Sequence, residues 1–473
     1  MELTNLVANL DPVCEADFAS FVKYKLGKKI GRFHREIIEN LETSSKHLHV
    51  QASRGFFKTT IISICYPLWC LWKPQKRKLN IGIVSHSLSR SSEIMRLIKQ
   101  EIMERPEIAK RVLPEDMHHA IWSATEIITK KGHRVVCVPP GGVQGDHFDL
   151  LILDDIQRDE DGTGAALANL KKTFWNVICP IVNARKGKML VVGTPLSFDD
   201  LYSEIKENPG FMFMKYPAVK VNERGEWIES IFPEHYTIED LQKIRDGLPS
   251  WAWQSQYMLN PIGAGTGLFP LELINSCIDP TIGQISEDPA QIKRNCAHYI
   301  GCDIALSEDK RADSSCFVVI RKNFETNEMS MVYKQIPPKG TNSDEQVTRI
   351  ADLVKIYGTS RVVIEQKGLG YSLAQKAFME IPSVEKFDTT RSKKEQILGN
   401  VELLMRNKKL KLPKDDAMIN ELMSFGLKRK IDGTETFEAL SGHDDQVMAL
   451  ALACYAAGGW TSKGTVRNSL ALI

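Results

Sequence analysis

The sequence predicts an α/β protein with two domains. Of its 473 residues, 43% are apolar and 25% are charged, a composition that is ordinary for a globular protein. A chain of this length exceeds what a single hydrophobic core usually holds. In the first half, strand-like apolar runs alternate with helical segments, as in a doubly wound parallel sheet. In the second half, three successive strand-like runs precede a helix and another strand, which indicates a meander in a mixed sheet. We expect domains at 1–262 and 293–460, a linker at 263–292 and a C-terminal tail at 461–473.

Charge and cysteine content exclude several classes of protein. The net charge of +2 creates no global field toward nucleic acid, so a nucleic-acid surface would have to be a local patch. The ten cysteines contain no C-x-x-C pair, which favours reduced core thiols over disulfides or a zinc site. The longest mostly apolar run, 61–72, is too short to span a bilayer, and the N-terminus lacks a signal-peptide pattern. We therefore expect no membrane partner.

The stretch Ser53–Thr60 reads Ser-Arg-Gly-Phe-Phe-Lys-Thr-Thr and lies between a short extended run and a longer apolar segment. A strand, a loop and a helix in this order form a phosphate site, because backbone N–H groups and the helix N-terminus face the anion. Lys58 would reach the outer phosphates, and the Thr59 hydroxyl would hold Mg²⁺. However, Ala52 and Phe57 stand where the P-loop pattern has glycines. A lysine at an ordinary strand-to-helix turn therefore explains the motif alone equally well.

The run Leu150–Asp155 is a continuous apolar strand that ends in two carboxylates. Such runs are typical of parallel strands buried on both faces, and ligands of open α/β sheets bind at the strands' carboxyl ends. In a P-loop enzyme Asp154 would hold Mg²⁺ through water, and Asp155 would polarise the attacking water. A later strand, 188–192, leads to Thr194, which could sense the γ-phosphate. The alternative is that the two aspartates only cap a helix.

Four acids of the second half are far apart in the sequence. Asp303 lies in the first strand of the meander, Glu365 ends a later strand, and Asp444 and Asp445 open a late helix. In the RNase H-like fold these three elements meet on one side of the sheet. Such a carboxylate cluster can hold two Mg²⁺ or Mn²⁺ ions roughly 4 Å apart, which clamp the attacking and leaving oxygens of a phosphodiester. Any single acid is more often a turn or helix cap, so the order of the motifs carries the nuclease prediction.

The combined order resembles the large terminase subunits of tailed double-stranded DNA viruses. The resemblance covers about Phe33–Gly458 and has two departures: Phe57 precedes the lysine where glycine is usual, and Asp155 stands where many relatives have glutamate. The stretches that carry the resemblance are Ser53–Thr60, the Gly-Gly-Val-Gln-Gly loop at 141–145, Leu-Ile-Leu-Asp-Asp-Ile at 151–156, Val-Val-Gly-Thr-Pro at 191–195, Trp253–Pro261, Glu365–Gly370 and His443–Asp445.

The resemblance implies an N-terminal P-loop ATPase domain (RecA-like, ASCE type) and a C-terminal RNase H-like nuclease domain (RuvC type). The implied catalytic residues are Arg54, Lys58, Asp155, Asp303, Glu365, Asp444 and Asp445. The implied nucleotide site comprises Ser53, Arg54, Gly55, Phe56, Phe57, Lys58, Thr59, Thr60, Asp154 and Thr194, and the implied metal ligands are Thr59, Asp154, Asp303, Glu365, Asp444 and Asp445. Either both Asp444 and Asp445 or only one of them would bind metal.

The expected cofactors are ATP with Mg²⁺ and two Mg²⁺ or Mn²⁺ ions in the nuclease site. The expected partners are double-stranded DNA, a portal protein, a small terminase subunit and further copies in a ring, expected to be a pentamer, on the procapsid in the host cytoplasm. Basic clusters at 391–394, 406–411 and 428–430 would supply phosphate contacts. Two alternatives are a helicase-nuclease of DNA repair or recombination, which should show a second RecA-like domain, and a DNA-binding scaffold that does not hydrolyse ATP.

Overall fold

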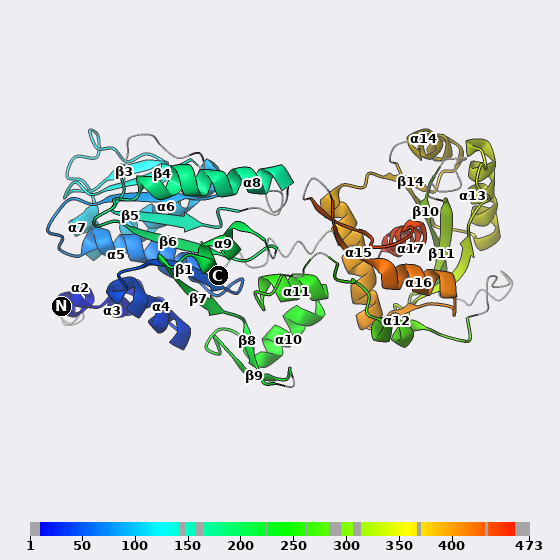
Figure 1. Ribbon diagram of the computed structural model, residues 1–473, viewed down its shortest axis with the longest axis horizontal. Helices are drawn as coiled ribbons and strands as arrows, with labels where there is room; N and C mark the ends of the chain where they lie inside the picture. Colours follow the sequence, from blue (N-terminus) through cyan, green and yellow to red (C-terminus); the bar gives the residue numbers. More distant parts are fainter. Residues whose placement is uncertain are drawn as a thin grey trace. The chain divides into compact units, whose positions relative to one another are not determined.

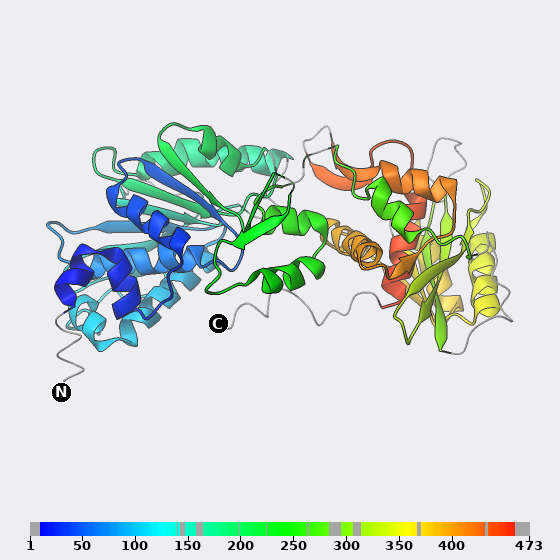
Figure 2. The same ribbon diagram turned by 90° about the horizontal axis from the view of Figure 1, so that it is seen from below.

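The structure, a computed structural model, describes residues 10–139, 141, 147–157, 164–197, 199–223, 225–261, 263, 265–282, 295–305, 314–366, 370–430 and 434–458. The chain forms two compact units (Figures 1 and 2). The first unit comprises Met1–Lys243 and Trp251–Ile262, and the second comprises Ile244–Ser250 and Gly263–Ile473. Within the described ranges, no helix is both long enough and apolar enough to cross a membrane.

A seven-stranded sheet in the order β3-β4-β2-β5-β6-β1-β7 organises the first unit. Among its described strands only β3 and β4 pair antiparallel, so the other strands share one carboxyl edge. All five residues of β5 are buried, as expected for a strand covered on both faces. The strands are β1 (His47–Ala52), β2 (Asn80–Val84), β3 (Glu126–Ile128), β4 (Arg134–Val138), β5 (Leu150–Asp154), β6 (Lys188–Gly193) and β7 (Phe211–Tyr216). The predicted parallel sheet is confirmed.

Helices cover this sheet, as Figure 1 shows. They are α2 (Asp11–Ala16), α3 (Phe18–Ser20), η1 (Phe21–Lys25), α4 (Arg32–Thr43), η2 (Thr59–Cys65), α5 (Tyr66–Trp72), α6 (Leu88–Met103), α7 (Pro106–Val112), α8 (Gly164–Thr173), η4 (Phe174–Ile178), η5 (Cys179–Ile181) and α9 (Leu201–Glu207). A small two-stranded sheet, β8 (Val219–Val221) and β9 (Trp227–Ser230), precedes α10 (Ile238–Asp246) and α11 (Ser250–Gln256).

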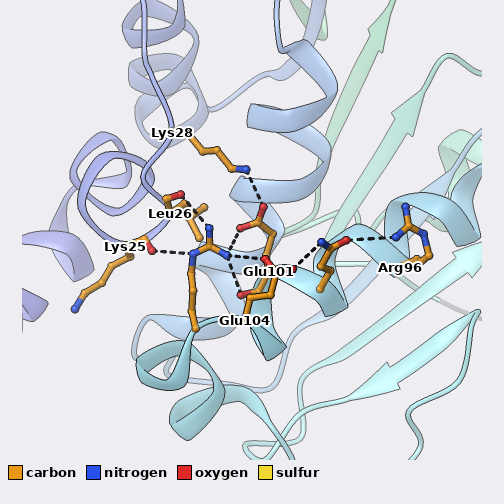
Figure 3. Close-up of polar contacts among 8 residues, drawn as sticks. Lys25, Leu26, Lys28, Arg96, Glu101 and Glu104 are labelled. Atoms are coloured by element: carbon orange, nitrogen blue, oxygen red, sulfur yellow. Dashed lines mark hydrogen bonds and ion pairs between the residues drawn. The ribbon is translucent and has the colours of Figure 1, made fainter. Parts of the chain in front are cut away.

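The short helices that precede β1 are fixed to α6 through one arginine. Arg105 donates hydrogen bonds to the carbonyls of Lys25 and Leu26, both at 3.1 Å, and forms a 2.6 Å ion pair with Glu101. Lys28 reaches the same Glu101 carboxylate at 2.9 Å (Figure 3). Charge-assisted hydrogen bonds of this kind are stronger than neutral ones, so the lead-in helices are held to the sheet's own helices.

The second unit contains a six-stranded sheet in the order β14-β13-β10-β11-β12-β15. The strands are β10 (Cys296–Asp303), β11 (Cys316–Asn323), β12 (Met329–Gln335), β13 (Arg361–Glu365), β14 (Val384–Phe387) and β15 (Leu410–Lys411). β10, β11 and β12 form the predicted antiparallel meander, whereas β13 runs parallel to β10. The register pairs Cys302 with Ile364, so Asp303 and Glu365 follow at the same edge of the sheet.

The helices of this unit are α12 (Leu271–Cys277), α13 (Ser343–Tyr357), α14 (Gly370–Glu380), α15 (Arg391–Arg406), α16 (Asp416–Ser424) and α17 (Asp445–Ala456). A hairpin, β16 (Phe425–Arg429) with β17 (Glu435–Ala439), joins α16 to α17. α17 lies directly on β10, because a Cβ at Gly301 would stand 2.2 Å from the carbonyl oxygen of Ala449. Every residue of α17 except Tyr455 is buried.

The stretch 263–292, expected to be a linker, differs from that expectation in its described part. Residues 265–282 contain α12, and Phe269, Ile274 and Cys277 are buried in the second unit. The backbone of this stretch also forms bridges, Gly267 with Gly426 and Ile278 with Leu412. The run Gly-Ala-Gly-Thr-Gly at 263–267 and the prolines and polar residues after it indicated a connector, although apolar residues that anchor the stretch lie among them.

Candidate active sites

The loop between β1 and η2 turns at Gly55, whose φ is 79°. A Cβ there would stand 2.7 Å from the Tyr236 hydroxyl oxygen, so both the backbone conformation and the space require glycine. The Ser53 hydroxyl, which is fully buried, donates to the carbonyl of Tyr257 at 2.6 Å. These contacts fix the start of the loop against the rest of the first unit.

Two phenylalanines hold the middle of the loop. Phe56 is fully buried and stacks on Tyr236 at 5.3 Å between ring centroids, and its carbonyl accepts a hydrogen bond from His34 at 3.0 Å. Phe57 has a φ of 53°, the left-handed region that glycine usually occupies in such loops. Its ring packs on His235 at 4.7 Å and Phe232 at 5.5 Å. Aromatic packing therefore compensates for the missing glycine directly before Lys58.

Asp154 accepts hydrogen bonds from two hydroxyls of the loop helix η2. Thr59 donates to it at 3.1 Å, and Ser63, one turn later on η2, also donates to it. Burial raises the pKa of Asp154 to about 6, and the neighbouring charge of Asp155 adds to this effect. A hydroxyl at the start of the loop helix and a carboxylate at the end of β5 are the groups that hold Mg²⁺ in P-loop enzymes. Ser63 was not singled out in the sequence, although its i+4 spacing from Thr59 places both hydroxyls on one helix face.

Asp155 follows β5 with a φ of 45°, and its backbone N–H donates to the carbonyl of Val192 at 2.9 Å. The His86 ring lies 3.2 Å from the Asp155 carbonyl, a neighbour that no sequence pattern indicated. Lys58 is buried and its charge lowers the pKa of Asp154, while Thr60 is half-buried. Thr194 follows β6 at the same carboxyl edge of the sheet and is half-buried. The sheet thus gathers these predicted groups along one edge.

Arg54 is held by the end of α11. Its guanidinium donates to the Gln256 side-chain oxygen at 3.0 Å, and its backbone N–H donates to the Gln256 carbonyl at 3.1 Å. Gln256 belongs to the Trp253–Pro261 stretch that contributes to the family resemblance. The glycine-rich loop at 141–145 lies, apart from Gly141, outside the described residues, as do 367–369 behind Glu365 and the tail at 461–473.

The four acids of the second half meet at one edge of the second sheet. Asp303 and Glu365 end the neighbouring parallel strands β10 and β13, while Asp444 and Asp445 begin α17, which packs on β10. The pKa of Asp303 lies well above its usual range, because of burial first and then because of the charge of Glu365, with smaller contributions from Asp445 and Asp444. Acids that repel one another in this way form an environment that favours a bound cation.

Hard oxygen donors such as these suit Mg²⁺ or Mn²⁺, so the chemistry of the cluster fits the expected metal ions. Asp444 and Asp445 also have partners outside the cluster. Asp444 forms a 3.0 Å ion pair with Lys394, and Asp445 accepts a hydrogen bond from the Ser314 backbone N–H at 2.7 Å. Over the described part of the chain, no three such ligands are already arranged to enclose a metal ion. Metal binding through Asp444 or Asp445 would compete with these two contacts.

The basic clusters at 391–394, 406–411 and 428–430 contain residues that already form ion pairs with acids of the same unit. Acidic side chains of the same unit pair with several of their members, as Glu435 does with Arg429 at 2.8 Å and Glu438 with Lys430 at 3.0 Å. The other pairs are Arg391 with Glu395, Lys394 with Asp444, and Arg406 with Glu402. Part of the positive charge of each cluster is therefore compensated within the unit. Phosphate contacts by the paired members must compete with these ion pairs.

Comparisons with known proteins repeatedly find similarity to terminases. The family profile described as Terminase RNaseH-like domain matches residues 300–456. The large terminase subunit of Thermus phage G20c is 30% identical over 331 residues, which is 66% of this chain and 62% of that protein. That of Thermus virus P23-45 is 24% identical over 326 residues, with the same two shares. The chain thus spans less than two thirds of the length of these relatives.

Among solved structures, the large terminase of a thermophilic bacteriophage has a similar fold. One of its crystal forms matches with a TM-score of 0.54 at 10% identity and covers 90% of this chain and 99% of that chain. A likeness at this identity concerns the fold, and it extends over both units described above. The profile, the relatives and the fold agree: the chain is similar to the large terminase subunits of bacteriophages, and its residues 300–456 match the terminase RNaseH-like domain.

Proposed function

We propose that this chain is the motor subunit of a viral DNA-packaging machine. Its first unit hydrolyses ATP to move double-stranded DNA into a procapsid, and its second unit cuts concatemeric DNA by two-metal catalysis. One observation carries the proposal: Asp303, Glu365, Asp444 and Asp445, which are distant in the sequence, come together in a unit that shares its chain with a phosphate loop.

In the first unit, Lys58 and the backbone N–H groups of the loop bind the outer phosphates of ATP. Thr59 and Asp154 would hold Mg²⁺, which neutralises charge on the phosphates when it is bound. Asp155 orients the attacking water, and Arg54 leaves Gln256 to contact the γ-phosphate. A large terminase of the same fold, from the thermophilic bacteriophage compared above, has been solved in complex with ATP-gamma-S.

In the second unit, Asp303, Glu365, Asp444 and Asp445 would hold two Mg²⁺ or Mn²⁺ ions. Such ions stabilise charge on the attacking and leaving oxygens of the phosphodiester. The protein's part is to present oxygen ligands from three elements at one sheet edge, and the close packing of α17 on Gly301 makes that presentation rigid. The proposed partners are double-stranded DNA, a portal protein, a small terminase subunit and a ring of copies, a pentamer, in the host cytoplasm.

Two substitutions in the full-length chain test the two activities separately. Lys58→Ala should abolish ATP hydrolysis and leave Mn²⁺-dependent plasmid cutting intact, whereas Asp303→Asn should do the reverse. Each variant thus serves as the folding control for the other. ATP hydrolysis that survives Lys58→Ala would refute the phosphate-loop assignment, whereas a wild-type chain that does not hydrolyse ATP would favour the scaffold alternative. Cutting that survives Asp303→Asn would refute the carboxylate cluster.

A further inference from the structure

The first turn of α17 has an unusual source of capping. The first N–H groups of any helix lack partners within the helix, and an aspartate at the N-cap normally accepts hydrogen bonds from them. Asp444 occupies that position, yet within the described part of the chain its carboxylate makes no such bond. It forms the ion pair with Lys394 instead. The simple view that Asp444 is only a helix cap is therefore inconsistent with this structure.

A glutamate from another helix does the capping. Glu421 on α16 accepts hydrogen bonds from the backbone N–H groups of Gln446 at 2.6 Å and Val447 at 2.8 Å. Its second oxygen accepts from the Gln446 side chain at 2.7 Å. The Gln446 side-chain oxygen in turn accepts from Lys334 at 2.6 Å, so the cap is itself held from β12.

This arrangement is energetically costly for a cap alone. Glu421 is only 9% exposed, and burial raises its pKa to about 7 while the three donated hydrogen bonds oppose that rise. The nearby charge of Asp445 adds repulsion. An aspartate or serine at the N-cap would satisfy the same N–H groups without a second buried acid beside the cluster. Because the cap comes from α16, the N-cap residue Asp444 does not have to supply it.

We propose that Glu421 is a positioning residue of the nuclease site, which caps α17 from α16 and so leaves the Asp444 carboxylate available to a divalent cation. This inference rests on the proposed nuclease function. If the acceptor at residue 421 is lost, the N–H groups of Gln446 and Val447 lose their partner. Asp444, the N-cap residue, can then turn to cap them, and its carboxylate leaves the cluster.

The main test replaces Glu421 with an apolar side chain of similar length, Glu421→Met, in the full-length chain without nucleotide. Mn²⁺ binding is measured from the electron paramagnetic resonance signal of free Mn²⁺. Loss of groups that orient metal ligands typically weakens metal binding by about 10-fold or more, and we expect that effect here. Glu421→Gln keeps one side-chain oxygen that can accept both backbone N–H groups, so it should retain affinity within about threefold. An effect of charge alone would instead weaken both variants equally and would overturn the proposal.

Glu402 provides a matched control, because it is a buried acid of the same unit at 2% exposure that accepts from Ser250 rather than from α17. Glu402→Gln should bind Mn²⁺ like the wild type. Asp303→Asn reports the proposed function itself: if it binds Mn²⁺ and cuts DNA like the wild type, the nuclease site is wrong whatever Glu421 does. If Asp303→Asn loses both and Glu421→Met still binds within twofold of wild type, only the role of Glu421 is refuted.

A measurement on the wild type keeps the proposal testable if Glu421→Met does not fold. Hydrogen exchange of peptides that cover 445–450 should stay equally slow or become slower when Mg²⁺ is added, because the Glu421 cap persists in the metal-bound state. Faster exchange of these amides on Mg²⁺ addition would mean that Glu421 no longer caps α17 in the metal-bound state. That result would overturn the proposal.

Discussion

Phe57 adopts a backbone conformation that residues with side chains rarely take, with φ at 53° directly before Lys58. Replacing it by alanine removes the ring contacts with Phe232 and His235 but keeps a Cβ in the left-handed region. Replacing it by glycine removes the same contacts and also the strain. The loss of the ring is common to both variants, so their difference isolates the backbone term.

The expected difference follows from two opposing effects. A Cβ in the left-handed region costs about 1–2 kcal/mol, whereas the greater freedom of glycine in the unfolded chain costs about 0.5–1 kcal/mol. Phe57→Gly should therefore be more stable than Phe57→Ala by about 0.5–1 kcal/mol, which reverses the usual order of the two residues. Arg96, an exposed residue inside α6, is the control, because there alanine should exceed glycine by about 1 kcal/mol.

Urea unfolding followed by tryptophan fluorescence measures both pairs of variants. Seven of the eight tryptophans lie in the first unit, so the signal reports mainly on the unit that contains Phe57 and Arg96. If Phe57→Ala equals or exceeds Phe57→Gly in stability while the Arg96 pair behaves normally, Phe57 does not occupy the left-handed region. The explanation of how this loop dispenses with its usual glycine would then fail.

Three further substitutions test the packing. Gly301→Ala would force a Cβ to 2.2 Å from the Ala449 carbonyl oxygen. We therefore expect the second unit to lose at least about 3 kcal/mol of stability and the variant to cut no DNA. A near-normal urea unfolding curve, measured by circular dichroism, would contradict this expectation. Gly55→Ala should cost about 2–4 kcal/mol by urea titration, and adding Tyr236→Phe should recover the part due to the 2.7 Å contact; a double variant no more stable than Gly55→Ala would rule that contact out. Arg105→Met should destabilise the first unit by about 2 kcal/mol through the lost bonds to η1 and α6; a change below about 0.5 kcal/mol in the fluorescence titration would show that this network is dispensable.

The fold could be predicted where the pattern of side chains decides the structure. The run Leu150–Leu153 is apolar throughout, which suits a strand covered on both faces, and every residue of β5 is buried. The meander was equally clear, because the polar turn after β11 separates two apolar runs. α12 was missed because the glycine-rich run at 263–267 directly before it indicated a connector, although the buried side chains of Phe269 and Ile274 fix the segment.

The site could be predicted only as far as its chemistry leaves a mark on the sequence. Asp303, Glu365, Asp444 and Asp445 stand at element ends, where acids are informative in combination. Glu421 lies inside a short helix, where a glutamate is usually solvated, and only the three-dimensional approach of α16 to α17 shows its partners. His86 was missed for the same reason, since its partner is a backbone carbonyl at the end of another strand.

The central claim is that four acids distant in the sequence form one cation site that cuts DNA. Anomalous diffraction from Mn²⁺-soaked crystals of the full-length chain tests it most directly. We predict two Mn²⁺ peaks bounded by Asp303, Glu365 and at least one of Asp444 and Asp445, and we predict that both peaks are lost or greatly weakened in Asp303→Asn. Mn²⁺ peaks only at other places, or unchanged peaks in Asp303→Asn, would contradict the claim.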